Sequence, residues 1–95
     1  MKYDLPVKYD ELTPAQRREV RFQYTKMQKN LCYFCKCSLD GPPPKEITDK
    51  PIDWRFFPPN FTKYRIHLQH SHISGLTEGA VHSECNAYFW QYHGR

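Results

Sequence analysis

Two pairs of metal-ligand residues, far apart in the chain, constrain the fold more than any other feature of this sequence. The first pair is Cys32-x2-Cys35 and the second is His82-x2-Cys85. Thiolate and imidazole are the usual ligands of tetrahedral zinc, and four of them form a structural site with no open position. The spacing therefore predicts one zinc ion that joins two distant segments of the chain.

The cysteines also admit two other interpretations. Two disulfides are one, but residues 1–30 contain no apolar signal-peptide core and no segment reaches membrane-spanning length. We therefore expect a reducing, cytoplasmic compartment without membrane association, where metal ligation is favoured over disulfides. Cys37 is the second complication, because it either replaces His82 in an all-cysteine site or remains a free thiol. We favour His82, since the second pair would otherwise be incomplete.

Length and charge narrow the class of protein further. With 95 residues, the chain is near the size at which an apolar core alone is sufficient. The apparent binding free energy of a structural zinc is about 10–16 kcal/mol near neutral pH. The whole stability of a typical domain is about 5–15 kcal/mol, so zinc binding would decide whether this chain folds. The formal net charge of +4 fits a polyanionic partner better than a cationic one.

The clearest predicted element is a helix near the N-terminus. Thr13-Pro14-Ala15-Gln16 supplies an N-cap, a proline at the first helical position and a capping box. The helix is expected to run to about Lys29, with Asn30 as terminator. Helical spacing predicts a buried stripe of Val20, Tyr24, Met27 and Leu31. Basic residues lie mostly off that stripe, and they either contact phosphates or form a solvated face: Arg17, Arg18, Arg21, Lys26 and Lys29.

The remaining elements predict a small α+β domain. Residues 40–63 are rich in proline and are expected to be irregular, with aromatic side chains that pin this segment to the body. Residues 64–70 read as a strand, Ala80-Val81 as a short return strand, and residues 83–92 as a closing helix. We expect an arm and basic helix in residues 1–30, packed on a core domain of residues 31–95.

The predicted strand carries a cluster of histidines that resembles a known family. The cluster reads His67-Leu-Gln69-His70-Ser71-His72, and Asn86 directly follows Cys85. Together with the ligand pairs, it resembles the HNH, or ββα-metal, nucleases, and by pattern the phage recombination endonuclease VII group. The resemblance covers roughly residues 31–95 and implies a small zinc-stabilised ββα-metal (HNH) domain with an N-terminal basic helix.

The resemblance implies a metal-dependent DNA endonuclease that nicks or cuts by phosphodiester hydrolysis. His70 matches the general base, a role that suits an imidazole because it is largely neutral at physiological pH. Gln69 and Asn86 match the ligands of one catalytic divalent ion, Mg²⁺ or Mn²⁺, which prefers hard oxygen donors. His72 is expected near the scissile phosphate or the ion. His93 is either a further ligand or a favourable charge at the end of the last helix.

Two departures from the family leave an alternative open. The family usually has aspartate at the position of Gln69, and acidic residues are common at the position of Ser71. A neutral ligand binds the ion more weakly, so the alternative is a zinc-stabilised nucleic-acid-binding module that has lost catalysis. A third option is a nuclease that acts on RNA. His67 is expected on the opposite strand face from His70, in a structural or surface role.

The resemblance also carries expectations about partners. Contacts with DNA are expected to be mostly to the backbone. One domain has one active site, so cutting both strands would require a homodimer. A phage origin, implied only by the resemblance, would place the protein in the host cytoplasm.

Overall fold

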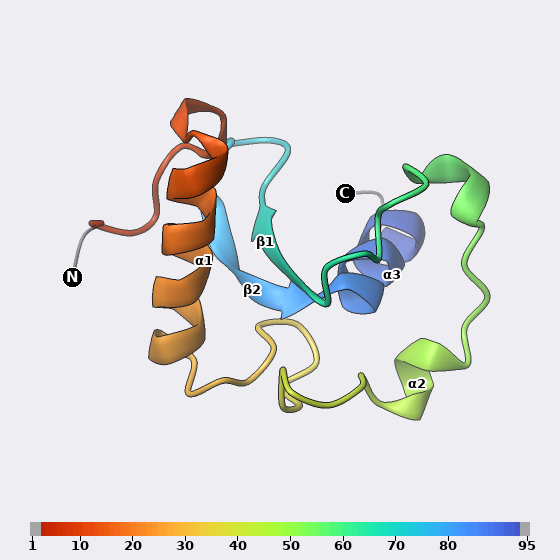
Figure 1. Cartoon of the computed structure of the whole chain (residues 1–95). Helices are drawn as coiled ribbons and strands as arrows, with labels where there is room; N and C mark the ends of the chain where they lie inside the picture. Colours follow the sequence, from red (N-terminus) through yellow and green to blue (C-terminus); the bar gives the residue numbers. More distant parts are fainter. Residues whose placement is uncertain (1–2, 94–95) are drawn as a thin grey trace.

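The structure is a computed structural model that describes residues 3–93, and the side chain of His93 lies outside the described part. It is a small α+β fold (Figure 1). In chain order, its elements are α1 (Pro14–Met27), α2 (Lys45–Thr48), β1 (Ile66–His70), β2 (Thr77–His82) and α3 (Ser83–His93). Short 3-10 turns occupy Tyr9–Glu11 and Trp54–Phe56.

The two strands form one antiparallel hairpin that is followed directly by α3. Ile66 lies opposite His82 and Gln69 lies opposite Gly79, but His70 lies opposite Thr77. Glu78 is therefore the extra residue of a bulge at the end of β1. The return strand is longer than the expected Ala80-Val81, and the first strand begins at Ile66 rather than Tyr64.

Helix α1 begins as the sequence predicts. The Thr13 hydroxyl accepts a hydrogen bond from the backbone of Gln16, and the Gln16 side chain accepts one from the backbone of Thr13. After Met27 the helix unwinds, and Lys29 and Asn30 adopt positive φ angles of 55° and 62°. This is the left-handed conformation in which helices commonly end, and asparagine tolerates it well.

Only part of the predicted helical stripe is buried. Val20 and Tyr24 pack into the core, whereas Met27 is 61% exposed and Leu31 is 41% exposed. The prediction was wrong for these two residues because the helix ends at Met27 and the chain then turns away. Gln23 is buried instead, where its side-chain amide pairs with both backbone polar groups of Tyr3.

The outer edge of β2 is paired by three other segments. The Gln28 carboxamide accepts a hydrogen bond from the Ala80 N–H at 2.9 Å and donates one to the Ala80 carbonyl at 2.9 Å. The Tyr33 N–H donates to the same carbonyl. Nearer the start of the strand, the Thr77 N–H donates to the carbonyl of Val7 in the N-terminal arm. These contacts tie the arm, the end of α1 and the Cys32–Cys35 turn to one strand.

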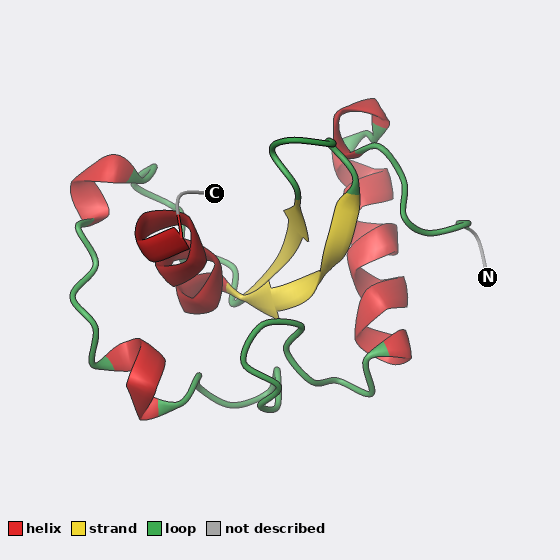
Figure 2. Ribbon diagram, turned by 180° about the vertical axis from the view of Figure 1, so that it is seen from behind, coloured by secondary structure: helices red, strands yellow, loops and turns green. Residues whose placement is uncertain are grey.

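Helices α1 and α3 lie on opposite sides of the hairpin, as views from the front and from behind show (Figures 1 and 2). The long segment between the cysteine turn and β1 passes around the α3 side and contains α2, which contacts α3. This segment was expected to be irregular, and α2 and the Trp54–Phe56 turn are its short regular parts. The buried core joins α1, the hairpin and the cysteine turn through these residues: Val20, Tyr24, Cys32, Leu39, Ile47, Leu68, Ala80, Val81 and Cys85.

Candidate metal cage and histidine cleft

The four predicted zinc ligands come together in one cage. The Sγ atoms of Cys32, Cys35 and Cys85 and a ring nitrogen of His82 all lie within 4.8 Å of one another. Zinc–sulfur bonds of about 2.3 Å set ligand–ligand distances of roughly 3.8 Å in a tetrahedron, so small shifts suffice to close the cage. Three of the four residues are buried, and the donor set is the one that structural zinc prefers. These residues could hold a structural metal such as zinc.

Local backbone structure holds the cysteine turn ready for a cation. The Cys35 N–H donates to the Cys32 sulfur at 3.4 Å, and the Lys36 N–H donates to the Cys32 carbonyl at 3.0 Å. Lys36 has a φ of 67°, which allows the chain to turn back beneath the two sulfur atoms. The second pair stands where β2 passes into α3, so His82 ends the strand and Cys85 lies in the first turn of the helix.

The ring of His82 is oriented as a metal ligand requires. Its Nε2 lies 2.9 Å from the Ser38 carbonyl oxygen and 3.0 Å from the Gly41 carbonyl oxygen. A carbonyl only accepts, so Nε2 carries the proton and Nδ1 keeps its lone pair. That Nδ1 lies 3.4 Å from the Cys35 sulfur. Metal-bound histidines commonly donate their other ring N–H in this way.

Cys37 lies outside the four-residue cage, and the geometry therefore favours His82 as the fourth ligand. The Cys37 carbonyl instead accepts a hydrogen bond from the Cys32 N–H at 2.8 Å. All four cysteines are free thiols. The disulfide interpretation of the cysteines finds no support in this geometry.

The cage thiols influence one another's ionisation. A hydrogen bond from the Cys85 thiol lowers the pKa of Cys32 to about 4. Burial raises the pKa of Cys35 to about 11, and the hydrogen bond to Cys32 raises the pKa of Cys85. The protein groups alone therefore favour one thiolate. Ionisation of all three needs positive charge among them, which a zinc ion supplies.

The three histidines of the cluster, His67, His70 and His72, line a cleft of about 570 Å³. Residues from β1, α3 and α1 meet there. Six of its lining residues were predicted from the sequence to take part in catalysis or DNA binding: Arg17, Arg21, Gln69, His70, His72 and Asn86. His70 and Asn86, the two residues on which the nuclease interpretation depends most, thus face the same space.

The His70 ring stacks against two other rings. The Tyr9 ring stacks on it at 3.9 Å between centroids with an interplanar angle of 11°, and the His72 ring lies at 4.8 Å. The Arg17 guanidinium lies 4.0 Å from the centroid of the Tyr9 ring. Burial, and then the neighbouring His72, lower the pKa of His70. The imidazole is therefore neutral at physiological pH, the form that accepts a proton.

Asn86 contacts His67 rather than His70. Its Nδ2 lies 3.2 Å from Nδ1 of His67, and both side chains line the cleft. When Nδ2 donates this bond, the Asn86 Oδ1 stays available to another partner. The sequence predicted a structural or surface role for His67. Because side chains alternate along a strand, the sequence also indicated that His67 and Gln69 share a face, and this could have identified His67 as a residue of the site. Burial lowers the pKa of His67, so this ring is neutral as well.

Gln69 presents an oxygen that lacks a hydrogen-bond partner. The side chain is 5% exposed, and its Nε2 donates to the Glu78 carboxylate at 2.8 Å. Its Oε1 is buried and makes no hydrogen bond. Leaving a buried acceptor unpaired costs about 1–3 kcal/mol, and a bound cation would remove that cost. Carboxamide oxygens are hard donors, so Gln69 and Asn86 could hold Mg²⁺ or Mn²⁺. The bulge brings the Glu78 carboxylate within hydrogen-bond distance of the Gln69 Nε2.

The basic residues of α1 divide into two groups. Arg17 and Arg21 line the cleft, whereas Arg18, Lys26 and Lys29 do not. Of the basic residues predicted to contact phosphates, Arg17 and Arg21 are thus the two that lie at the cleft. His93, predicted as a further ligand, belongs to α3, but its side chain lies outside the described residues.

Comparison with known proteins gives no family for this chain. No family model, no curated protein and no solved structure matches it. Within residues 3–93, no helix is both long enough and apolar enough to cross a membrane.

Proposed function

We propose that the chain is a metal-dependent DNA endonuclease of the HNH type. One observation carries the proposal: Gln69, whose buried Oε1 has no hydrogen-bond partner, and His70, a neutral imidazole stacked against two rings, line the same cleft. A hard-cation ligand and a general base in one basic cleft are what phosphodiester hydrolysis requires. The cage shapes the end of β2 and the start of α3, and thereby fixes the position of Asn86.

In this proposal each lining residue has its own task. His70 takes a proton from the attacking water, and stacking on Tyr9 keeps its ring in place. Gln69 and Asn86 hold a divalent ion, which would stabilise negative charge on the departing oxygen. Arg17 and Arg21 bind phosphates that flank the cleaved bond, because guanidinium groups pair with phosphate oxygens in two-bond geometry.

Glu78 supplies the negative charge that Gln69 lacks. Its carboxylate accepts the hydrogen bond from the Gln69 Nε2, which fixes the carboxamide, leaves Oε1 without a hydrogen-bond partner and makes that oxygen a better donor. Glu78 acts here as a positioning residue.

Plasmid nicking tests the proposal. The zinc-loaded protein should relax supercoiled plasmid with Mg²⁺ or Mn²⁺, and His70→Ala should reduce the rate by about 10²- to 10⁴-fold, the usual contribution of a general base. The matched control is Lys26→Ala, because Lys26 lies on α1 but outside the cleft. Both variants should keep their zinc. Nicking by His70→Ala at the wild-type rate would refute its assignment as the base.

A binding module without catalysis is the second candidate. It is favoured by the composition of the cleft, since none of the described residues that line it is a carboxylate. DNA binding that depends on Arg17 and Arg21, with no nicking under any divalent ion, would support it. Structured RNA offered in the same assay separates the third option, a nuclease that acts on RNA.

A further inference from the structure

We propose that the cleft receives an unpaired nucleotide, with its base stacked on an aromatic wall and its phosphate held by α1. The inference rests on the proposed function only in that the bound strand would be the strand that is cut. The shared chemistry is a free base face next to a phosphate, which single-stranded DNA and single-stranded RNA both offer.

The aromatic wall is formed by five residues, four from the segment before β1 and one from α3: Phe56, Phe57, Phe61, Tyr64 and Trp90. Three of its rings contact one another, with Phe57 and Phe61 at 4.8 Å and Phe57 and Trp90 at 6.3 Å between centroids. Phe56 is nevertheless 72% exposed and Tyr64 is 64% exposed. Exposed rings beside a basic cleft are typical of proteins that bind single strands, where each stacked base contributes about 1–3 kcal/mol.

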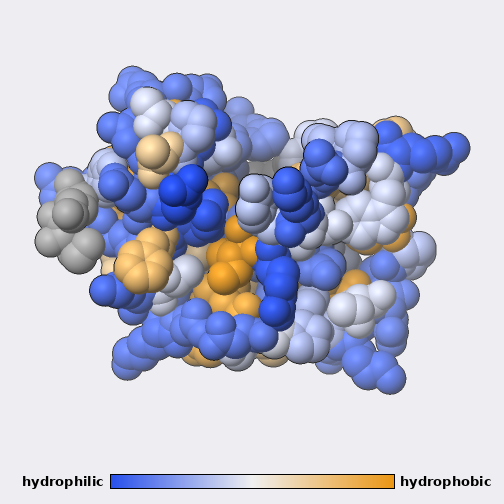
Figure 3. All heavy atoms as spheres, in the orientation of Figure 1, coloured by the Kyte–Doolittle hydropathy of each residue, from blue (hydrophilic) through white to orange (hydrophobic). Residues whose placement is uncertain are grey.

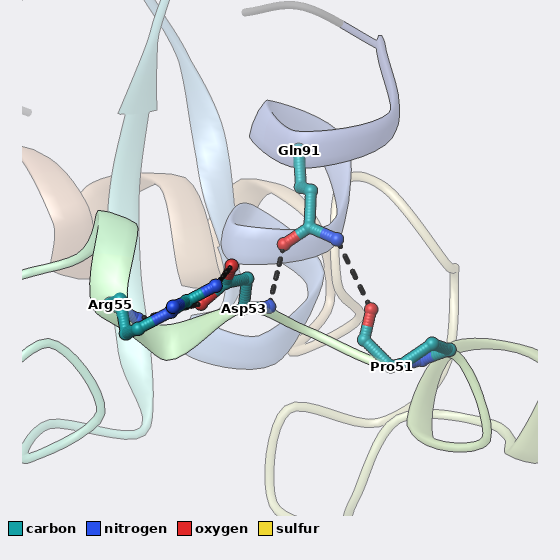
Figure 4. A network of polar contacts seen from close by, with 4 residues as sticks. All are labelled: Pro51, Asp53, Arg55 and Gln91. Carbon is teal, nitrogen blue, oxygen red and sulfur yellow. Dashed lines mark hydrogen bonds and ion pairs between the residues drawn. The ribbon is translucent and has the colours of Figure 1, made fainter.

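A polar network holds the start of the aromatic wall against α3 (Figure 4). Gln91 of α3 donates to the Pro51 carbonyl at 3.2 Å and accepts from the Asp53 N–H at 2.9 Å. Asp53 in turn pairs with Arg55 at 2.7 Å. Phe56 and Phe57 therefore directly follow an anchored segment, so this part of the wall needs little ordering when a base binds.

The cleft also carries positive charge. Arg17 and Arg21 of α1 line it, and none of the described residues in its lining is Asp or Glu. The space-filling view shows hydrophobic side chains gathered in a hollow at the middle of this face, bordered by strongly hydrophilic ones (Figure 3). An apolar surface beside guanidinium groups is complementary to a base joined to a phosphate.

The size of the cleft favours an unpaired nucleotide over a duplex. Its volume of about 570 Å³ lies in the range of small-molecule sites. In a duplex the faces of the bases are covered by their neighbours, so a base can reach an aromatic wall only from a single strand or after leaving the stack. The cleft should therefore prefer single strands, gaps or frayed ends to intact duplex.

Binding measured without cleavage tests this inference. Fluorescence anisotropy is followed with labelled single-stranded DNA, single-stranded RNA and duplex DNA of one sequence, with zinc-loaded protein and no added Mg²⁺ or Mn²⁺. The variants are Phe56→Ala and Tyr64→Ala, whose exposed side chains contribute little to the core. The control is Phe22→Ala, because Phe22 on α1 is 61% exposed and lies outside the cleft.

We expect tighter binding of a single strand than of duplex, and a loss of roughly 5- to 150-fold for each wall variant, as removal of one stacked base predicts. The control should bind like the wild type. If single-stranded RNA binds as tightly as single-stranded DNA, the result supports base stacking on the aromatic wall and shows that RNA as well as DNA can supply the unpaired nucleotide. Duplex bound as tightly as single strands, or Phe22→Ala as damaging as Phe56→Ala, would overturn the inference while leaving nicking and its dependence on His70 intact.

Discussion

Removing one sulfur from the cage gives the most direct test of what stabilises this fold. Cys85→Ser replaces a buried thiol by a hydroxyl, which does not ionise as a thiolate does. A structural zinc contributes about 10–16 kcal/mol, which equals or exceeds the total stability of a typical domain, about 5–15 kcal/mol. Cys85 also anchors the first turn of α3, so its loss separates that helix from the cysteine turn. We expect the variant to be largely unfolded at 25 °C.

The assay combines zinc content, far-UV circular dichroism and thermal melting. Wild-type protein should hold one zinc per chain and unfold when a strong chelator removes it. Cys37→Ser is the matched control, because Cys37 lies outside the cage and a partly exposed substitution usually changes stability by less than about 0.5 kcal/mol. The reasoning fails if Cys85→Ser retains both zinc and its melting transition, or if Cys37→Ser releases the metal.

Two further substitutions test the cleft and the hairpin. Glu78→Gln should weaken Mn²⁺ binding by about 10- to 100-fold, the usual effect of removing a partner of a metal ligand; electron paramagnetic resonance of Mn²⁺ measures this directly, with Glu46→Gln on α2 as control. Unchanged affinity would exclude a positioning role for Glu78. Gly79→Ala would place a Cβ 2.8 Å from the side chain of Tyr33 and should cost about 1–3 kcal/mol by thermal melting. Gly41→Ala meets nothing within 4 Å and should melt like the wild type, and equal melting of both variants would contradict the close approach.

The features that depend on local sequence were predictable. The capping box at Thr13 forms because all its partners lie within one turn of helix. The cage was predictable because zinc ligands have characteristic pairs and spacings, which requires no knowledge of the intervening chain. Identifying the fourth ligand required the structure. The choice between His82 and Cys37 depends on the carbonyls of Ser38 and Gly41, which orient the imidazole of His82.

Strand register, the end of a helix and the exposure of aromatic rings were not predictable from the sequence. The bulge at Glu78 arises from the register of the two strands, and only the register brings this carboxylate to Gln69. Helical spacing predicted that Met27 would be buried, but the end of α1 removed it from the core. The exposed aromatic side chains were expected to pin an irregular loop, because composition does not reveal which face of a ring meets solvent.

The occupied edge of β2 limits how copies of this chain can associate. Main-chain groups of Thr77 and Ala80 are already bonded to Val7, Gln28 and Tyr33, so a second molecule cannot extend the sheet there without displacing them. Edge-to-edge stacking, a common route to fibrils, is blocked at this strand by the protein's own side chain and backbone. A homodimer that cuts both strands would have to assemble through another surface.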